Sequence, residues 1–289
     1  MGTAKRERQK EGRQARIEAA RAAQQRATRT RSIRNFAIVI VLIFIGIFAV
    51  SRFTGGSNSD NSTVAADSSS SSSGDATATT TAGAGGVPIT VPPAGAAISG
   101  DTPCPAADGS AARTTTFAKA PPTCIDAAKT YTAQVVTNKG TMTIALDAKA
   151  TPITVNNFVV LARYHYFDGV AFHRIITGFV DQTGDAVGPT PGQGGPGYTI
   201  NDENPADNSV YTDGAIAMAN TGSANSGGSQ WFIVVGTGGQ QLTATYAKFG
   251  QLTSGNDVAL AINQLATQNT SGSTTTDLVT IQSVTITES

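Results

Sequence analysis

Alternating apolar and polar positions in the C-terminal half of the chain predict short β-strands. Residues 131–137 and 141–147 are rich in β-branched side chains and flank a glycine-containing turn at 138–140, so they predict a β-hairpin. Further strand-like runs occur at 169–176, 214–219, 230–235, 247–252 and 278–286. Many short strands with few helices predict a mostly β fold, in which an antiparallel sheet closes, or nearly closes, on itself as a barrel.

Two segments in this half have the residue spacing of amphipathic helices. The first begins at Thr151-Pro152, a helix-capping residue followed by a first-turn proline. Its apolar face consists of Val155, Phe158, Val159 and Ala162. The second begins near Asn256-Asp257, and its apolar face consists of Val258, Ala261, Ile262 and Leu265. We expect these two helices to cap the barrel.

Near the N-terminus, an uninterrupted apolar run of fifteen residues covers 36–50. Its length is near the lower limit for crossing a bilayer, about 17 residues. We therefore predict a transmembrane helix over 35–53 that acts as a signal anchor. A cleaved signal peptide is the alternative, since Ala49-Val50-Ser51 is an acceptable cleavage triplet. In both cases the basic N-terminus stays in the cytoplasm and the C-terminal bulk lies outside, at the cell membrane.

The formal net charge of zero conceals a strong asymmetry. Residues 1–34 contain eleven Lys and Arg against three Glu, or +8, which leaves nine basic and seventeen acidic residues, or −8, in 35–289. Residues 1–34 also have almost no large apolar side chains, so we interpret them as a basic cytoplasmic tail. The balanced total argues against nucleic acid as a partner, whereas the asymmetry favours a membrane.

Between the apolar run and the strands, residues 54–100 contain no Lys, Arg or aromatic residue and are dominated by Ser, Thr, Ala and Gly. Such a segment cannot bury enough apolar surface to order itself, so we predict a disordered linker. Residues 101–129 form a lead-in that contains both cysteines, and 130–289 form the folded domain. Outside the cytoplasm, Cys104 and Cys124 favour a disulfide worth about 3 kcal/mol, with free buried thiols as the alternative.

Three familiar kinds of catalytic or binding motif are poorly supported. Residues 192–197 match GxGxxG, but Pro196 interrupts the motif and a strand-like run follows it, which excludes the usual nucleotide loop. His165 and His173 have no Cys or acidic neighbours at metal-ligand spacing, so we predict no metal and no cofactor. Serines lie near glycines, yet no G-x-S-x-G elbow occurs, so a serine hydrolase is not favoured.

Three motifs in order along the chain do carry a resemblance. They are Phe-His-Arg-Ile-Ile-Thr-Gly-Phe-Val-Asp-Gln-Thr-Gly-Asp at 172–185, the pair 217–222 and 228–233, and Leu242 with 248–250. Over roughly 130–287 the chain resembles the cyclophilin family of peptidyl-prolyl isomerases, and it is identified as a bacterial, membrane-anchored member. The resemblance implies a closed eight-stranded antiparallel barrel with two capping helices. The chain departs from the family pattern at Thr177, where proline is usual, and at Thr183, where glycine is usual.

The resemblance also implies roles for individual residues. The family's essential catalytic arginine falls on Arg174. Its substrate-binding positions fall on Phe179, Val180, Phe232 and Leu242 as walls of a proline pocket, Gln182 and Gln230 as amides, Ala219 and Asn220 as the segment that pairs with the substrate backbone, and Tyr246. Gln241 and Tyr246 stand where many eukaryotic members have Trp and His, which implies weak inhibition by cyclosporin.

These residue types suit rotation about an X-Pro bond. The barrier of about 18–20 kcal/mol comes from amide resonance, and no bond is broken, so neither cofactor nor metal is required. An arginine can donate a hydrogen bond to the prolyl nitrogen when resonance is lost. We therefore expect a monomeric peptidyl-prolyl cis-trans isomerase that acts on proline-containing polypeptides and assists protein folding. The alternative, suggested by Thr177 and Thr183, is a non-catalytic module that binds or scaffolds proline-containing peptides.

Overall fold

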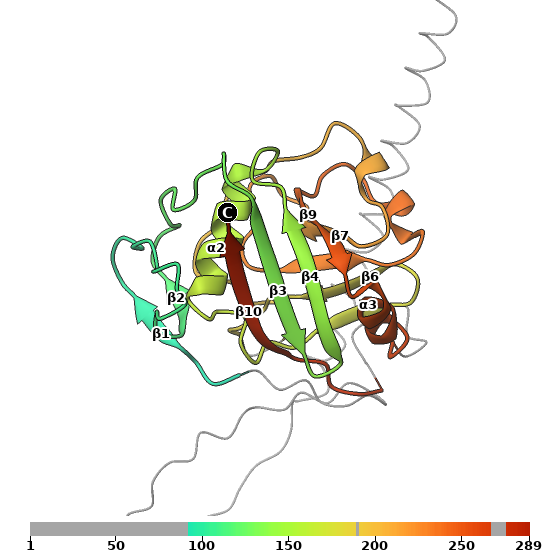
Figure 1. The fold of residues 1–289 in the computed structure, drawn as a ribbon, viewed down its shortest axis with the longest axis horizontal. Coiled ribbons are helices and arrows are strands. Elements are labelled where there is room, and N and C mark those ends of the chain that lie inside the picture. The colour runs from blue at the N-terminus through green and yellow to red at the C-terminus, as the bar shows by residue number, and fades with distance from the viewer. Residues whose placement is uncertain (1–91, 189–190, 267–275) are drawn as a thin grey trace, which may run out of the picture. The chain divides into compact units, whose positions relative to one another are not determined.

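The computed structural model describes residues 92–188, 191–266 and 276–289 (Figure 1). The strands are β1 Ala96–Ile98, β2 Thr114–Phe117, β3 Tyr131–Thr137, β4 Gly140–Leu146, β5 Arg174–Ile176, β6 Val180–Thr183, β7 Ala215–Met218, β8 Trp231–Val234, β9 Lys248–Ser254 and β10 Ile281–Glu288. The helices are α2 Pro152–Arg163 and α3 Asn256–Asn263, with two 3₁₀ turns, η1 Asn208–Val210 and η2 Gly238–Gln241.

The basic tail 1–34 and the predicted membrane helix 35–53 lie outside the described residues, as does most of the linker 54–100. Within the described ranges, no helix combines the length and the apolar character needed to span a bilayer. The membrane anchor therefore stays a prediction.

Eight strands form one antiparallel sheet in the order β10-β3-β4-β9-β7-β8-β6-β5. The prediction of a closed barrel is wrong, because the two edge strands, β10 and β5, are not paired with each other in the described part of the chain. The residues before β5 do bond to the start of β10 and to the residues before it. Gly169 N–H donates to Ile281 O and Ile281 N–H to Val170 O, both at 2.8 Å, Phe172 N–H donates to Val279 O at 3.0 Å, and Ala171 forms an isolated bridge with Thr280. Gly169 has φ +80, which turns the chain away from extended structure. The residues between Gly169 and β5 form only these separate bonds and the isolated bridge. The predicted strand 169–176 is therefore reduced to its last three residues, and the sheet is a half-barrel.

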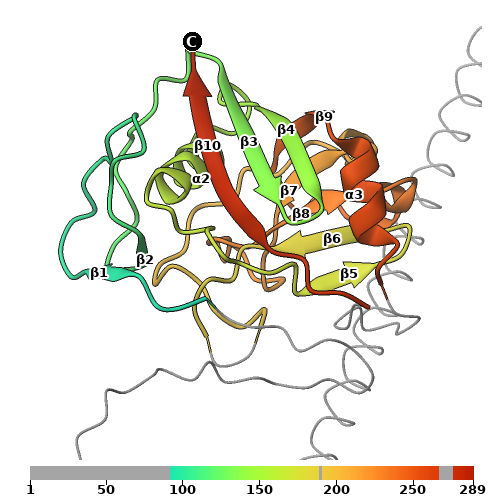
Figure 2. The same ribbon diagram turned by 60° about the horizontal axis from the view of Figure 1, so that its bottom comes forward.

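The hairpin and both helices are where the residue patterns predicted them. β3 and β4 pair in continuous register from Tyr131 opposite Leu146 to Thr137 opposite Gly140. Figure 2 shows α2 and α3 at opposite ends of the curved sheet, where α2 packs on β10 and α3 on β4, β5 and β6. The two helices therefore cap the half-barrel.

The predicted linker extends too far. Ala96–Ile98, inside the predicted range 54–100, forms β1 and pairs in parallel with β2. Ala96 N–H donates to Arg113 O at 2.9 Å, and the Arg113 guanidinium donates to Pro93 O at 2.6 Å. This segment of small residues is ordered because it pairs with β2. Composition alone does not reveal such a pairing.

Alternate residues of the central strands supply two separate apolar clusters. On β8, Trp231 and Ile233 belong to the inner core, which is fully buried around Phe158. Phe232 and Val234 point to the other face and join a second cluster with Val180, Tyr211, Ala215, Ala217 and Leu242. Because side chains alternate across a strand, each strand contributes to the core and to a surface outside it.

A distant carboxylate caps helix α2. Thr151 was predicted as its cap, and although it occupies that position, its side chain donates back to Asp147 O instead of accepting from the helix. The free N–H groups of Ile153 and Thr154 donate to the two carboxylate oxygens of Glu203 at 2.9 and 2.8 Å. The carboxylate therefore satisfies two unpaired donors and lies at the positive end of the helix dipole.

Replacement of this carboxylate tests its contribution to stability. We expect Glu203→Gln to lower the free energy of unfolding by about 1 kcal/mol, since it removes the charge and one of the two acceptors. Urea unfolding followed by circular dichroism measures the change. Asp101→Asn is the control, because that carboxylate forms an exposed ion pair with Lys119, and exposed pairs contribute about 0–1 kcal/mol. Equal losses in both variants would contradict the capping role.

Candidate active site

A row of paired residues crosses four neighbouring strands and forms the floor of the site. Arg174 on β5 lies opposite Gln182 on β6, Gln182 lies opposite Phe232 on β8, and Phe232 lies opposite Ala217 on β7. Side chains at paired positions are neighbours on the same face of a sheet. The register therefore places a guanidinium, an amide and an aromatic ring side by side.

A hollow of about 250 Å³ lies over this row. Its lining contains nine of the ten residues implied by the resemblance: Arg174, Phe179, Val180, Gln182, Ala219, Asn220, Phe232, Leu242 and Tyr246. The tenth, Gln230, lines a second hollow of about 520 Å³. The two hollows share Gln182, Ala219 and Asn220, so they form one continuous groove.

Hydrogen bonds link the arginine to the second hollow through two amides. Arg174 Nη1 donates to Gln182 Oε1 at 3.2 Å, and Gln182 Nε2 donates to Gln230 Oε1 at 3.0 Å. Gln230 Nε2 in turn donates to the carbonyls of Gly192 and Gly194 at 3.0 and 2.9 Å. Partial burial lowers the pKa of Arg174 from its ordinary value, but an arginine remains charged in proteins. The groove thus holds an oriented positive donor.

The apolar wall is held by a tyrosine that the sequence patterns did not reveal. Tyr211 Oη donates to Tyr246 O at 2.7 Å and accepts from Tyr246 N–H at 3.1 Å. The Tyr246 ring then packs edge-on against Phe232, with ring centroids 5.4 Å apart. Because 35 residues separate the two tyrosines, no local pattern connects them. Similarly, Asn208 Nδ2 donates to Leu242 O at 3.2 Å and so holds another apolar residue of the lining.

Helix α3 fixes the turn that presents Phe179. Asn263 Oδ1 accepts from Gly178 N–H at 2.7 Å, and its Nδ2 donates to Ile176 O at 3.0 Å and to Asp181 Oδ1 at 2.7 Å. Asp181 is fully buried, and its Oδ2 has no hydrogen-bond partner among the described residues. Burial raises the pKa of Asp181 to about 7, although the bond from Asn263 opposes the shift. Neither residue was predicted to belong to the site.

Ala219 and Asn220 form the rim of the groove. Ala219 N–H donates to Gln230 O at 2.9 Å, which continues the edge of the sheet. The Asn220 side chain donates to Thr245 O at 2.7 Å and accepts from Gly222 N–H at 3.0 Å. These bonds hold the segment that lines both hollows.

The two departures from the expected motif lie outside the groove lining. Thr183 is fully buried on the inner face of β6, and its Oγ1 donates to Ala171 O at 3.0 Å. Thr177 is exposed in the turn between β5 and β6. Neither threonine lines either hollow, so the observation that favoured a non-catalytic module does not affect the groove.

The weaker motifs have structural roles. Gly192 and Gly194 N–H donate to Asp185 Oδ2 at 2.6 and 2.9 Å, so a carboxylate of the chain itself occupies the donors of the glycine-rich loop. Burial lowers the pKa of His173 to about 4, which keeps this ring neutral. In the described ranges, no group of three or more His, Cys, Asp or Glu residues is arranged to hold a metal ion.

Together, the half-barrel and its groove define a site for a peptide with a small apolar ring, beside a charged donor. The family model of the cyclophilin type peptidyl-prolyl cis-trans isomerases matches residues 132–286. The chain belongs to this family, and it is a peptidyl-prolyl cis-trans isomerase.

The similarity extends to bacterial relatives. Peptidyl-prolyl cis-trans isomerase B of Bacillus subtilis is 43% identical over 114 residues, which cover 39% of this chain and 77% of the relative. Peptidyl-prolyl cis-trans isomerase A of Mycobacterium tuberculosis is 37% identical over 174 residues, which cover 54% of this chain and 92% of the relative. A crystal structure of a cyclophilin type isomerase from Cryptosporidium parvum is 28% identical, has a TM-score of 0.49, and matches over 55% of this chain and 98% of that one.

Proposed function

We propose that Arg174 is the catalytic residue and that the groove twists an X-Pro bond without covalent chemistry. The observation that supports this most strongly is the position of the Arg174 guanidinium in the same hollow as Phe232 and Leu242. A pyrrolidine ring seated against these apolar side chains has its nitrogen close to the permanent charge. When the bond twists, the nitrogen lone pair is released from resonance and accepts a hydrogen bond from Arg174. The contact is strongest in the transition state, as catalysis requires.

The amide relay supports this role by orienting the arginine. The bond from Arg174 to Gln182 holds the guanidinium over the floor of the groove, and Gln230 holds Gln182. A donor fixed in advance costs little reorganisation during the reaction. Shortening an uncatalysed time of tens of seconds to milliseconds requires about a 10⁴-fold acceleration, or about 5–6 kcal/mol. A charge-assisted hydrogen bond together with the exclusion of water is adequate for an effect of this size.

The isomerase is proposed to act outside the cytoplasm, on proline-containing segments of folding proteins, as a monomer tethered to the membrane. The basic tail 1–34 and the apolar run 36–50 support this orientation. The disulfide between Cys104 and Cys124 is also typical of an oxidising compartment. The groove holds one proline ring and the adjoining backbone, which many proteins can supply, so the range of substrate proteins is broad.

Protease added to intact cells tests the proposed location. We expect the domain 130–289 to be digested while an epitope within residues 1–34 remains protected until the membrane is permeabilised. A cytoplasmic protein of the same cells serves as the control for membrane integrity. Protection of both parts, or digestion of both, would contradict the proposed orientation. Refolding of a protein limited by proline isomerisation, with and without the chain, tests the role in folding.

A further inference from the structure

Strand β2 lies before the family-matched residues 132–286. It nevertheless contacts the loop 192–198, which forms the wall of the second hollow. Phe117 N–H donates to Pro196 O at 2.8 Å, and Pro196 lines the second hollow. Gly197 adopts φ +102, and a Cβ on it would lie 2.4 Å from Phe117 O. The loop therefore approaches β2 so closely that only glycine fits at this position.

The Phe117 side chain reinforces this junction. It is 1% exposed and packs edge-on against Tyr164 and Tyr198, with ring centroids 5.4 and 6.1 Å apart. Tyr198 also lines the second hollow. Edge-to-face aromatic pairs have a preferred geometry, so Phe117 restrains both the backbone and a side chain of the wall.

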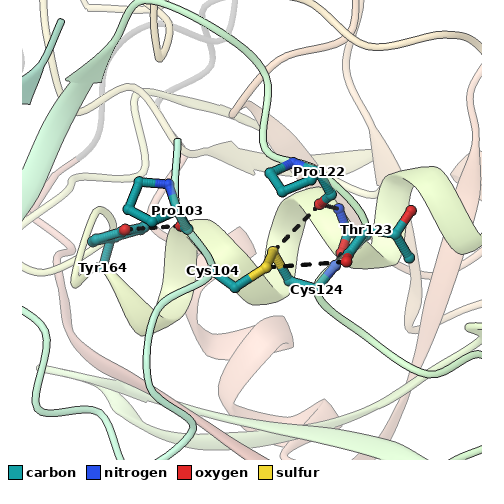
Figure 3. Close-up of a disulfide and its surroundings, with 7 residues drawn as sticks. Pro103, Cys104, Pro122, Thr123, Cys124 and Tyr164 are labelled. Atoms are coloured by element: carbon teal, nitrogen blue, oxygen red, sulfur yellow. Dashed lines mark hydrogen bonds between the residues drawn. A yellow bond between two sulfur atoms is a disulfide. The ribbon is translucent and has the colours of Figure 1, made fainter. Parts of the chain in front are cut away.

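Helix α2 and the disulfide secure both ends of the segment that carries β2. A disulfide joins Cys104 to Cys124 (Figure 3). Strand β2 lies between the two cysteines in the sequence. Next to Cys104, Pro103 O accepts from the hydroxyl of Tyr164, the residue directly after α2, at 2.9 Å. Next to Cys124, Asn156 on α2 donates to Pro122 O at 2.9 Å and accepts from Cys124 N–H at 2.7 Å. The disulfide-closed loop is thus fixed to the folded domain at its base and at β2.

The same wall is bonded to the floor of the groove on its other side. Gly192 O and Gly194 O accept from Gln230, which accepts from Gln182 next to Arg174. Contacts therefore run without a break from β2, through the loop 192–198, to the amides of the groove.

We propose that β2 supports the loop 192–198, which lines the second hollow of the substrate groove, and that Phe117 is a positioning residue. Phe117 fixes the loop 192–198 so that the second hollow is formed before a peptide binds, and residues flanking the proline gain affinity from it. This inference rests on the proposed role of the groove in peptide binding. A preformed wall avoids the free-energy cost of ordering a loop when the peptide binds. Loss of this wall therefore lowers the affinity for long peptides, which reach the second hollow, more than the affinity for short ones.

The test compares Phe117→Ala with the unaltered full chain on two substrates. One is an X-Pro dipeptide blocked at both ends, and the other is extended by three residues on each side of the X-Pro pair. For Phe117→Ala we expect KM to rise about five-fold for the long peptide and less than about two-fold for the short one, with kcat nearly unchanged for both, as for lost uniform binding. Val135→Ala, which truncates a fully buried core residue on β3, is the control, and we expect no dependence on peptide length.

Gly197→Ala breaks the same junction from the loop side and is expected to give the same length dependence if Phe117→Ala does not fold. Equal changes for the two peptides, or no change for either, would overturn the positioning role of Phe117. These outcomes are independent of Arg174→Ala, which tests the catalytic proposal. Loss of activity in Arg174→Ala without length dependence in the other two variants would reject this inference alone.

Discussion

Arg174→Ala is expected to lower kcat/KM for X-Pro peptides by about 10²–10³-fold, the usual effect of removing one donor that acts in the transition state. The reduction is expected mainly in kcat, because the apolar walls that hold the proline ring are unchanged. The fold is expected to persist, since Arg174 is only partly buried and its one described side-chain partner is Gln182. A protease-coupled isomerisation assay and circular dichroism measure the two effects.

Arg174→Lys is the matched control for this experiment. It keeps the positive charge but lacks the planar fork that donates to Gln182 and to the substrate at once. We expect this variant to recover less than about a tenth of the lost rate. Full recovery would show that charge alone is sufficient and would contradict the role assigned to an oriented guanidinium.

Asp181→Asn is expected to stabilise the folded protein at pH 8 and to have little effect near pH 4. The folded-state pKa of Asp181 is raised from 3.8 to about 7, so the folded protein binds the proton more tightly than the unfolded chain does. The stability associated with the protonated carboxyl is complete below about pH 4 and is lost as the pH rises to about 7. At about 1.36 kcal/mol per unit of pKa, the buried charge costs on the order of 4 kcal/mol at pH 8. The asparagine carries no charge and avoids that cost.

The contribution of His173 to folding stability has the opposite pH dependence. Its folded-state pKa is lowered from 6.5 to about 4, so the folded protein binds this proton less tightly, and stability is lost as the pH falls from about 6.5 to 4. In the unaltered chain the two contributions nearly cancel over that window. In Asp181→Asn only the contribution of His173 remains, so the free energy of unfolding is expected to decrease on acidification between pH 6.5 and 4. Urea unfolding at pH 4, 6 and 8 measures both effects.

A change in stability that is the same at all three pH values would contradict this assignment. It would mean that Asp181 is needed for its shape and hydrogen bond to Asn263 and that its ionisation has no measurable cost. Asp213→Asn is a suitable control, because that carboxylate is exposed, accepts from Gly236 N–H, and lies at the surface.

Local sequence patterns were sufficient to predict the elements whose structure depends on neighbouring residues. The hairpin at 131–147 follows from β-branched runs around a turn, and α2 follows from Thr151-Pro152 and the apolar spacing after it. Strand β6 was not predicted, because its four residues place Asp181 and Thr183 inward, where an apolar residue is expected. The open edge of the sheet was also missed, since the segment is still in a turn at Gly169, which has a positive φ, and the strand begins only at Arg174.

The residues of the groove followed from motifs, whereas their supports did not. Arg174 and Gln182 were identified within one continuous stretch, and the β5–β6 register brings them together. Tyr211 and Asn263 act on residues 35 and 82–87 positions away. Such contacts depend on the path of the whole chain. The motifs that carry the family resemblance therefore imply the residues of the site but not the hydrogen bonds that fix it.

Exchange between the cis and trans forms of an X-Pro peptide, measured by NMR with a small amount of the full chain, tests the central proposal most directly. The account predicts that the exchange rate rises in proportion to the concentration of the unaltered chain, and that Arg174→Ala binds the peptide but, at equal concentration, accelerates the exchange about 10²–10³-fold less. Equal acceleration by Arg174→Ala and by the unaltered chain would contradict it.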